Sequence, residues 1–493
     1  MYDSTREEAR RLLHGPVRTA TSTTAYDTAW TARVPDGHNL SAPAFPEALE
    51  WLRNHQHPDG SWGGQIEYYH DRVISTLAAI TALARDGGRR RDAEAIHRGE
   101  TYLRRNVRRL RHDPHETVGF ELIFPTLWRE AQRLELNLPY AAGERYDRLR
   151  EEKLRLIPPS VLYSREVTVA HSLEFLGDNL DVERARDAQE VNGSFGNSPS
   201  ATAYFLTRLP DDPAARRYLT EVMASNGGAA VPLHPVEIFD QSWMLYNLDL
   251  AGLLDDLRDE VRPCFDHFYR AWDDERGLGF SRQYSVPDLD DTAVVFKLLR
   301  KRGYDLDPLV FTAYEREDHL ACFPYERNPS VGVHVHLLDT LHMCPDWEPR
   351  PRVVDKILGF LRRTRVNYAY WFDKWHVSPY YATSHAVVAL IGFDDEMARD
   401  AVAWIVASQR SDGSWGWGRP TAEETAYCLQ ALAAYYRHTG SPNRTVLSRA
   451  AQYLYEHHEP GNYPPMWIDK CLYTPSQIVH SAVVSALGMY EDL

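Results

Sequence analysis

A glycine-centred turn that occurs three times constrains the fold of this chain more than any other feature. It reads QHPDGSWG at residues 56–63, QEVNGSFG at 189–196 and QRSDGSWG at 409–416, with a weaker copy at 272–280. Each copy follows one helical pattern and precedes another, and its central glycine permits a tight turn after a helix end. We interpret the repeat as a structural staple, in which the aromatic ring packs on a neighbouring turn and the Gln amide caps backbone groups.

Helical periodicity runs through almost the whole sequence. Apolar side chains recur at intervals of three and four residues in RVISTLAAITALAR, PRVVDKILGFLRRTR and AEETAYCLQALAAYYRH, while the alternation that is typical of strands is scarce. The pattern predicts an all-α chain of antiparallel helix pairs. Residues 224–235, rich in Gly and Pro, form the clearest break, so we expect each half to close into its own α-barrel.

Composition excludes several classes of function. The 493 residues exceed one ordinary core, and Lys+Arg 55 against Asp+Glu 70 gives a net charge of −15, which argues against a nucleic-acid partner. The N-terminus shows no apolar signal segment, and no run of about 18 apolar residues predicts a membrane span. Five widely spaced cysteines indicate neither a disulfide framework nor a metal site, so we expect a cytoplasmic protein.

Three carboxylates crowd into one short segment, YSVPDLDDTA, as Asp288, Asp290 and Asp291. A helix N-terminus favours a charged carboxylate by about 0.3–1 kcal/mol. Burial among like charges can raise a carboxyl pKa by about 3–5 pH units, so in a dry site one acid would stay protonated near neutral pH. Such an acid could protonate an alkene. The alternative is an acidic cap on a solvated turn.

A second acidic pattern points to the opposite chemistry. Asp255, Asp256 and Asp259 match the DDxxD pattern with which ionising terpene synthases bind magnesium and diphosphate. The pattern lies on a charged helix face, LLDDLRDEVR, and no partner motif of the NDxxSxxxE kind follows it. We therefore interpret these acids as a solvated surface.

Several motifs, taken in order, carry a family resemblance. They are the Gln–Gly–Trp repeats, the DLDDTA segment and the sequences STTAYDTAW at 22–30, TVGFEL at 117–122, AHSLE at 170–174, DKWHVSPYY at 373–381 and TAEETAY at 421–427. Together they resemble class II diterpene cyclases, the protonation-initiated enzymes that include copalyl and halimadienyl diphosphate synthases. The resemblance covers essentially the whole chain. It implies a βγ-type architecture with one barrel from residues 1–40 and 226–493 and a second, inserted barrel from 41–225.

The resemblance also implies roles for the acids. The central Asp of the family's DxDD motif falls on Asp290, which would be the proton donor, with Asp288 and Asp291 holding its geometry and protonation. His336 matches the family's Asn or His that hydrogen-bonds the catalytic acid. Without the family, a single His on an apolar helix is more often a core residue.

The resemblance also implies residues that bind a metal ion and the substrate. The family's magnesium–diphosphate motif falls on Glu174 and Asp178, which share a face if their segment is helical. The implied cofactor is Mg²⁺, and the alternative is an exposed acid pair. Ring faces that steady a carbocation would come from aromatic residues near the motifs. The implied substrate-binding residues are Trp243, Tyr284, Lys374, Trp375 and Tyr380, and Tyr246 is a further candidate ring.

These patterns predict a cyclase that protonates geranylgeranyl diphosphate and keeps the diphosphate on a bicyclic product. A downstream class I synthase or a phosphatase would then use that product. The nearest alternative is a sesquiterpene cyclase acting on farnesyl diphosphate, and a squalene-hopene-type cyclase is a more distant one. A non-catalytic helical toroid that binds a partner would have no need of a protonated acid at Asp290. The sequence names no base that ends the reaction.

Overall fold

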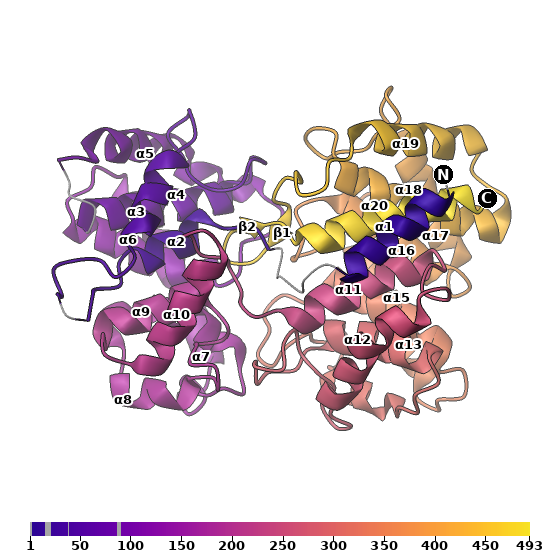
Figure 1. Cartoon of the computed structure of the whole chain (residues 1–493), viewed down its shortest axis with the longest axis horizontal. Helices are drawn as coiled ribbons and strands as arrows, with labels where there is room; N and C mark the ends of the chain where they lie inside the picture. The colour runs from indigo at the N-terminus through magenta and orange to yellow at the C-terminus, as the bar shows by residue number, and fades with distance from the viewer. Residues whose placement is uncertain (1, 15–20, 38, 86–89) are drawn as a thin grey trace.

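The computed structural model describes residues 2–14, 21–37, 39–85 and 90–493 as two helical units that lie side by side (Figure 1). The α-helices are α1 (Tyr2–His14), α2 (Ala25–Thr31), α3 (Pro46–Asn54), α4 (Tyr69–Arg85), α5 (Ala93–Asn106), α6 (Phe120–Arg133), α7 (Glu144–Leu156), α8 (Val182–Ala185), α9 (Pro199–Arg208), α10 (Pro213–Ser225), α11 (Glu237–Leu250), α12 (Arg258–Ala271), α13 (Leu289–Lys301), α14 (Val331–Thr340), α15 (Arg350–Thr364), α16 (Pro379–Leu390), α17 (Asp395–Ala407), α18 (Ala422–Thr439), α19 (Arg444–His457) and α20 (Ser476–Glu491). The 3₁₀ segments are η1 (Val107–His112), η2 (Tyr140–Gly143), η3 (Thr168–Asn179), η4 (Arg186–Ala188), η5 (Pro308–Tyr314) and η6 (Leu341–Met343). A short hairpin joins β1 (Trp467–Ile468) to β2 (Leu472–Tyr473).

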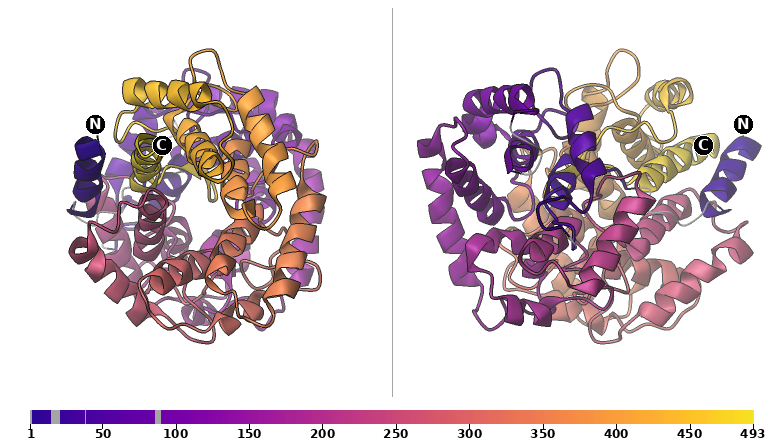
Figure 2. Two further views of the ribbon diagram at one scale, coloured as in Figure 1. Left: turned by 90° about the vertical axis from the view of Figure 1, so that its right-hand side faces the viewer. Right: turned by 60° about the vertical axis from the view of Figure 1, so that its left-hand side comes forward.

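Six inner helices close a ring in the unit that we call the C-barrel. Helices α11, α13, α14, α16, α18 and α20 each contact the next, and α20 contacts α11 again. Helices α12, α15, α17, α19 and α1 pack outside this ring, as the end-on view of Figure 2 shows. Every residue of α14 is buried, whereas α12 buries only Val261, Phe265 and Phe268. Apolar all-round helices thus line the barrel, and amphipathic helices cover it.

The second unit, the N-barrel, closes in the same way around α2, α4, α6, η3 and α9. Here the packing differs from the predicted division of the chain. Residues 1–40 were expected in the other barrel, yet α2 contacts α4 and α9, and Ala25–Val34 belongs to the N-barrel core. By contrast, α1 of this segment packs on α20 and α12 of the C-barrel, and residues 15–20 and 38 lie outside the described residues. The reason is that the N-barrel ring is open without α2.

The repeated turn acts as a staple at five places. The Trp62 indole donates to Leu52 O and the Trp415 indole to Ile405 O, both at 2.8 Å. In each copy the backbone N–H of the apolar residue donates to a Thr hydroxyl of the inner helix that follows; these pairs are Trp62–Thr76, Phe195–Thr202, Leu278–Thr292 and Trp415–Thr425. A fifth pair, Trp371–Thr383, shows the same contact without the Gln–Gly sequence. The staple therefore ties each turn to the inner helix that follows it, namely α4, α9, α13, α16 or α18.

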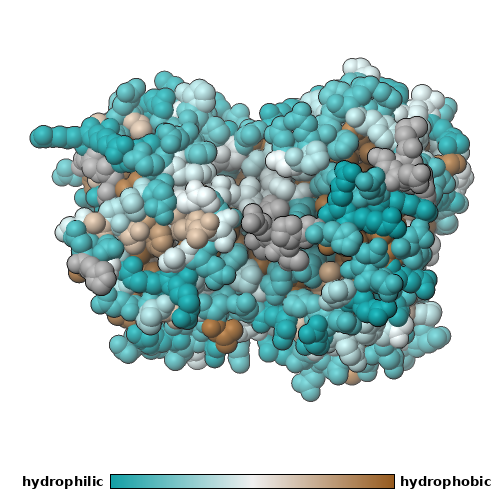
Figure 3. All heavy atoms as spheres, viewed as in Figure 1, coloured by the Kyte–Doolittle hydropathy of each residue, from teal (hydrophilic) through white to brown (hydrophobic). Residues whose placement is uncertain are grey.

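A hairpin from the C-barrel links the two units. Its strands carry the turn Asp469–Cys471 into the N-barrel, where Cys471 joins the apolar core and the Lys470 ammonium lies 2.8 Å from a Glu174 oxygen. The face shown in Figure 3 is mostly hydrophilic, with small separate apolar patches. Among the described residues no helix is both long and apolar enough to cross a membrane.

Substitution of a staple glycine tests this architecture. Gly413 has φ +93°, and an added Cβ would meet the Arg449 carbonyl oxygen. We expect Gly413→Ala to lower Tm more than Gly440→Ala, a matched control with φ +74° and open space around the Cβ position. The control carries only the left-handed backbone cost, about 1–2 kcal/mol. Equal Tm losses in thermal melts of the two variants would contradict the staple.

Candidate active site

The three clustered carboxylates lie at the N-terminus of α13, inside the C-barrel. Asp288 is the N-cap and its carboxylate accepts a hydrogen bond from the Asp291 N–H at 2.8 Å. Asp288 is 3% exposed and Asp291 is 4% exposed. Burial therefore excludes the alternative of a solvated acidic turn for these two residues.

Burial changes the acidity of this cluster. It raises the pKa of Asp288 to about 7, with a further rise from the charge of Asp290, while hydrogen bonds from Asp291 act in the opposite direction. Burial and the charges of Asp288 and Asp290 raise the pKa of Asp291 well above its usual value. The Trp243 indole, which donates to Asp291 Oδ1 at 3.2 Å, lowers it only in part. The cluster therefore retains a proton near neutral pH.

Asp290 differs from its two neighbours because its side chain is 17% exposed and reaches a cavity. Its Oδ1 lies 2.6 Å from His336 Nδ1, and His336 Nε2 lies 2.7 Å from His385 Nδ1. The three side chains come from three successive inner helices, α13, α14 and α16. Neither histidine lines the cavity. Of these three hydrogen-bonded side chains, Asp290 is therefore the one that faces a ligand.

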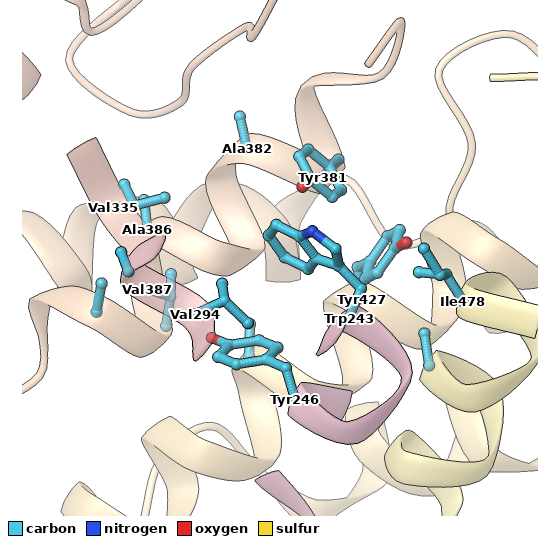
Figure 4. Packing of buried hydrophobic residues seen from close by; sticks show 14 of the residues in the cluster. Trp243, Tyr246, Val294, Val335, Tyr381, Ala382, Ala386, Val387, Tyr427 and Ile478 are labelled. Carbon is cyan, nitrogen blue, oxygen red and sulfur yellow. The ribbon is translucent and has the colours of Figure 1, made fainter. Parts of the chain in front are cut away.

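Aromatic rings surround the acid. The Trp243 ring meets the His336 ring edge-on, with 4.5 Å between centroids, and Figure 4 shows the rings of Trp243, Tyr246, Tyr381 and Tyr427 gathered around one region. The cavity itself measures about 290 Å³ and is lined by both barrels. Its apolar lining includes Leu122, Ile157, Val167 and Val169 from the N-barrel with Val236, Phe239, Trp243, Phe280, Tyr284, Phe323, Trp375, Tyr381, Trp467, Ile468 and Tyr473. Such a wall excludes water and offers ring faces to a cation.

Comparison with known proteins identifies the family. A family model for the C-terminal domain of squalene-hopene cyclases matches residues 325–474. A type B diterpene cyclase from Mycobacterium tuberculosis is 38% identical, over 96% of this chain and 96% of its own length. The chain belongs to the class II diterpene cyclases. The resemblance predicted from its motifs is thereby confirmed.

Solved structures agree with this cyclase fold. The ent-copalyl diphosphate synthase from Streptomyces platensis superposes with a TM-score of 0.81 at 29% identity, over 99% of this chain and 100% of that one. The two-barrel, all-α prediction is thus confirmed. The ent-copalyl diphosphate synthase of Arabidopsis thaliana is 35% identical over a segment that makes up 62% of this chain and 38% of that plant protein.

The cyclase places four of its five predicted substrate-binding residues at the cavity. Trp243, Tyr284, Lys374 and Trp375 line it, whereas Tyr380 does not. The Tyr380 ring stacks on Trp404 with 4.8 Å between centroids, and the neighbouring Tyr381 lines the cavity instead. Both lie in the first turn of α16, where adjacent side chains point about 100° apart, so only one can face the ligand.

The predicted metal pair does not form. Glu174 is fully buried; it accepts a hydrogen bond from the Tyr26 hydroxyl and pairs with Lys470, both at 2.8 Å. Asp178 is largely exposed and is held by Arg133 and Arg208. The segment is not a continuous α-helix, because Gly177 between the two acids has φ +56°. Across the described ranges, no group of three or more His, Cys, Asp or Glu side chains could hold a metal ion.

Of a charged cluster on the cavity wall, the sequence analysis predicted only Lys374. The cluster consists of Lys153, Arg327 and Lys374 with Glu116, Glu121 and Glu326. Arg327 pairs with Glu116 at 3.0 Å, Lys374 pairs with Glu326, and the Lys153 ammonium donates to the Tyr325 carbonyl at 3.3 Å. No spacing signal could have found it, since residues from both barrels meet only in the folded chain.

The DDxxD acids lie on the surface, as the sequence indicated. Asp255 is 73% exposed and pairs with Arg302, and Asp259 is 86% exposed and pairs with Arg262. Asp256 pairs with Arg6. Each faces an arginine rather than the cavity, so these acids are not part of the site.

Removal of the Glu174 charge tests whether this residue balances Lys470 or binds a metal ion. Glu174→Gln leaves the buried Lys470 ammonium without its carboxylate, so we expect it to lower the free energy of unfolding by about 3–5 kcal/mol. Asp178→Asn, the exposed control, should change it by about 0.5 kcal/mol or less. Denaturant melts measure both. A Glu174→Gln protein of normal stability that needs more magnesium would restore the original assignment.

Proposed function

We propose that this cyclase protonates geranylgeranyl diphosphate and releases a bicyclic diterpenyl diphosphate. The observation that carries the proposal is the contact between Asp290 and His336 at the wall of an aromatic cavity. A charged cluster lies on the same cavity, which suits a substrate with an alkene at one end and a diphosphate at the other. The names of the Streptomyces and Arabidopsis relatives, both copalyl diphosphate synthases, support retention of the diphosphate.

Asp290 would act as the general acid. Its carboxyl proton passes to the terminal alkene, and the carboxylate left behind is held by a hydrogen bond from His336 Nδ1–H. Burial raises the pKa values of Asp288 and Asp291, which reduces the negative charge beside Asp290 that would hold the proton back. The carbocation then folds against ring faces in a cavity that excludes water, and loss of a proton gives the bicyclic product.

The diphosphate would bind at Lys153, Arg327 and Lys374. Burial lowers the pKa of Lys153, and the charge of Glu121 opposes that fall. Glu116 and Glu121, on the same wall, supply carboxylates of the kind that a magnesium ion shares with a diphosphate. They fit the ion better than the predicted pair Glu174 and Asp178. A bound magnesium ion would neutralise part of the diphosphate charge.

Nothing in this arrangement pulls the diphosphate away. The DDxxD acids face water and arginines, and the cavity offers the diphosphate one charged cluster. The product would therefore leave with its diphosphate, and a separate enzyme of the class that ionises or hydrolyses prenyl diphosphates would consume it.

Loss of the acid should abolish the reaction. We expect Asp290→Asn to remove cyclisation and leave Tm unchanged, because the amide keeps the shape and lacks the proton. Asp255→Asn, the same change on the surface, is the control and should retain full activity. The assay incubates each protein with geranylgeranyl diphosphate, farnesyl diphosphate or squalene, and identifies products after phosphatase treatment. A folded Asp290→Asn protein that turns over normally would exclude the mechanism.

Loss of a cation should weaken substrate binding. A hydrogen bond to a charged group contributes about 1.5–3 kcal/mol, so we expect Arg327→Gln and Lys374→Gln to raise KM by about 10–100-fold with a smaller effect on kcat. Lys301→Gln, which removes a half-exposed cation paired with Asp249, is the control. Steady-state kinetics measure both constants. Inorganic pyrophosphate released in step with cyclisation would contradict the retained diphosphate.

A further inference from the structure

Two buried histidines form a line of hydrogen-bond contacts behind Asp290. His336 contacts Asp290 Oδ1 through Nδ1 at 2.6 Å and His385 Nδ1 through Nε2 at 2.7 Å. A neutral imidazole has one N–H donor and one acceptor nitrogen. Whichever histidine carries the proton between them therefore decides whether His336 donates to Asp290 or accepts from it.

Two arrangements satisfy these contacts when both imidazoles are neutral. In the first, His385 Nδ1–H donates to His336 Nε2, His336 Nδ1–H donates to Asp290 Oδ1, and the carboxyl proton of Asp290 stays on Oδ2. In the second, His336 Nε2–H donates to His385, and the neutral His336 Nδ1 accepts the carboxyl proton of Asp290. Only the first arrangement leaves that proton free for a substrate alkene.

The surroundings of His385 keep its ring neutral. Burial lowers its pKa well below the usual value, and positive charge on His336 or His376, when either ring is protonated, and on Lys297 acts in the same direction. The Asp339 carboxylate on α14 already has two partners. It pairs with Lys297 at 2.5 Å and accepts a hydrogen bond from the Tyr246 hydroxyl at 3.0 Å. A neutral His385 has one proton to give, and His336 is the partner of its Nδ1.

We propose that His385 is a positioning residue that donates through Nδ1–H, fixes the tautomer of His336 and so keeps the acid proton of Asp290 available to the substrate. This inference rests on the proposed function of Asp290. His385 acts through His336, since its ring does not line the cavity. In this role neither histidine gives up a proton. The proton that reaches the alkene comes from Asp290 alone.

Three substitutions separate donation from packing. In His385→Asn an amide N–H takes the place of Nδ1–H, in His385→Asp only acceptors remain, and His385→Leu has neither. We expect the Asn variant to keep kcat within about tenfold and the Asp and Leu variants to lose about 100-fold or more, with KM unchanged in all three. His480→Asn, at a buried histidine bound to Glu8 and Tyr463, controls for the loss of an imidazole.

Equal kcat losses in the Asn and Asp variants would overturn the proposal. So would a folded Leu variant with full kcat, or an effect confined to KM. Thermal melts of each variant identify those that fold.

A second measurement needs no substrate and uses the wild-type protein. In the ¹⁵N spectrum of protein labelled in its histidine rings, His336 is assigned by the signals that vanish in His336→Asn. We expect a protonated Nδ1 and an unprotonated Nε2 for His336, and the reverse would overturn the proposal. Because this result is independent of turnover, it stands apart from the Asp290→Asn assay: activity without the Asp290 acid would reject the proposed function, whereas the spectrum alone decides the tautomer.

Discussion

Exclusion of water from the start of α13 is the condition on which the rest of this cyclase depends. Three carboxyl groups within four residues would all ionise in solvent, and burial is the largest cause of the raised pKa values of Asp288 and Asp291. The closed ring of six inner helices supplies that burial. It also brings Asp290, His336 and His385 together from α13, α14 and α16. The barrel is therefore both the scaffold of the acid cluster and the cause of the raised pKa values of Asp288 and Asp291.

The two barrels make the cavity jointly, and the β1–β2 hairpin supplies buried contacts between them. Lys470 reaches Glu174, Asp469 lies 3.0 Å from His171, and the Leu472 N–H donates to Asp71 at 3.0 Å. These contacts explain why Glu174 is an acid without being a metal ligand. Its charge balances the buried Lys470 ammonium at 2.8 Å. The residues 170–174 of the family motif thus serve the contact between the barrels.

Local sequence predicted what local chemistry controls. The all-α class, the staple turns and the start of a helix at Asp288 follow from periodicity, glycine and capping, each of which acts within a few residues. The errors arose where the answer depends on orientation or on distant partners. Tyr380 and Tyr381 are indistinguishable in sequence, and the turn of α16 directs one to Trp404 and the other to the cavity. Trp371 forms a staple although its segment lacks the Gln–Gly pattern of the repeat.

The sequence by itself determined the family, the fold class and the acid segment. Each motif or repeat can be recognised within a short stretch, and the motifs follow one another in a fixed order. Only the tertiary structure decided which cations meet at the cavity, which barrel α2 completes, and that His385 stands behind His336. The physical reason is ring closure. Helices far apart in the chain become neighbours when each barrel closes, and no pattern within one helix records which side chains its neighbours will present.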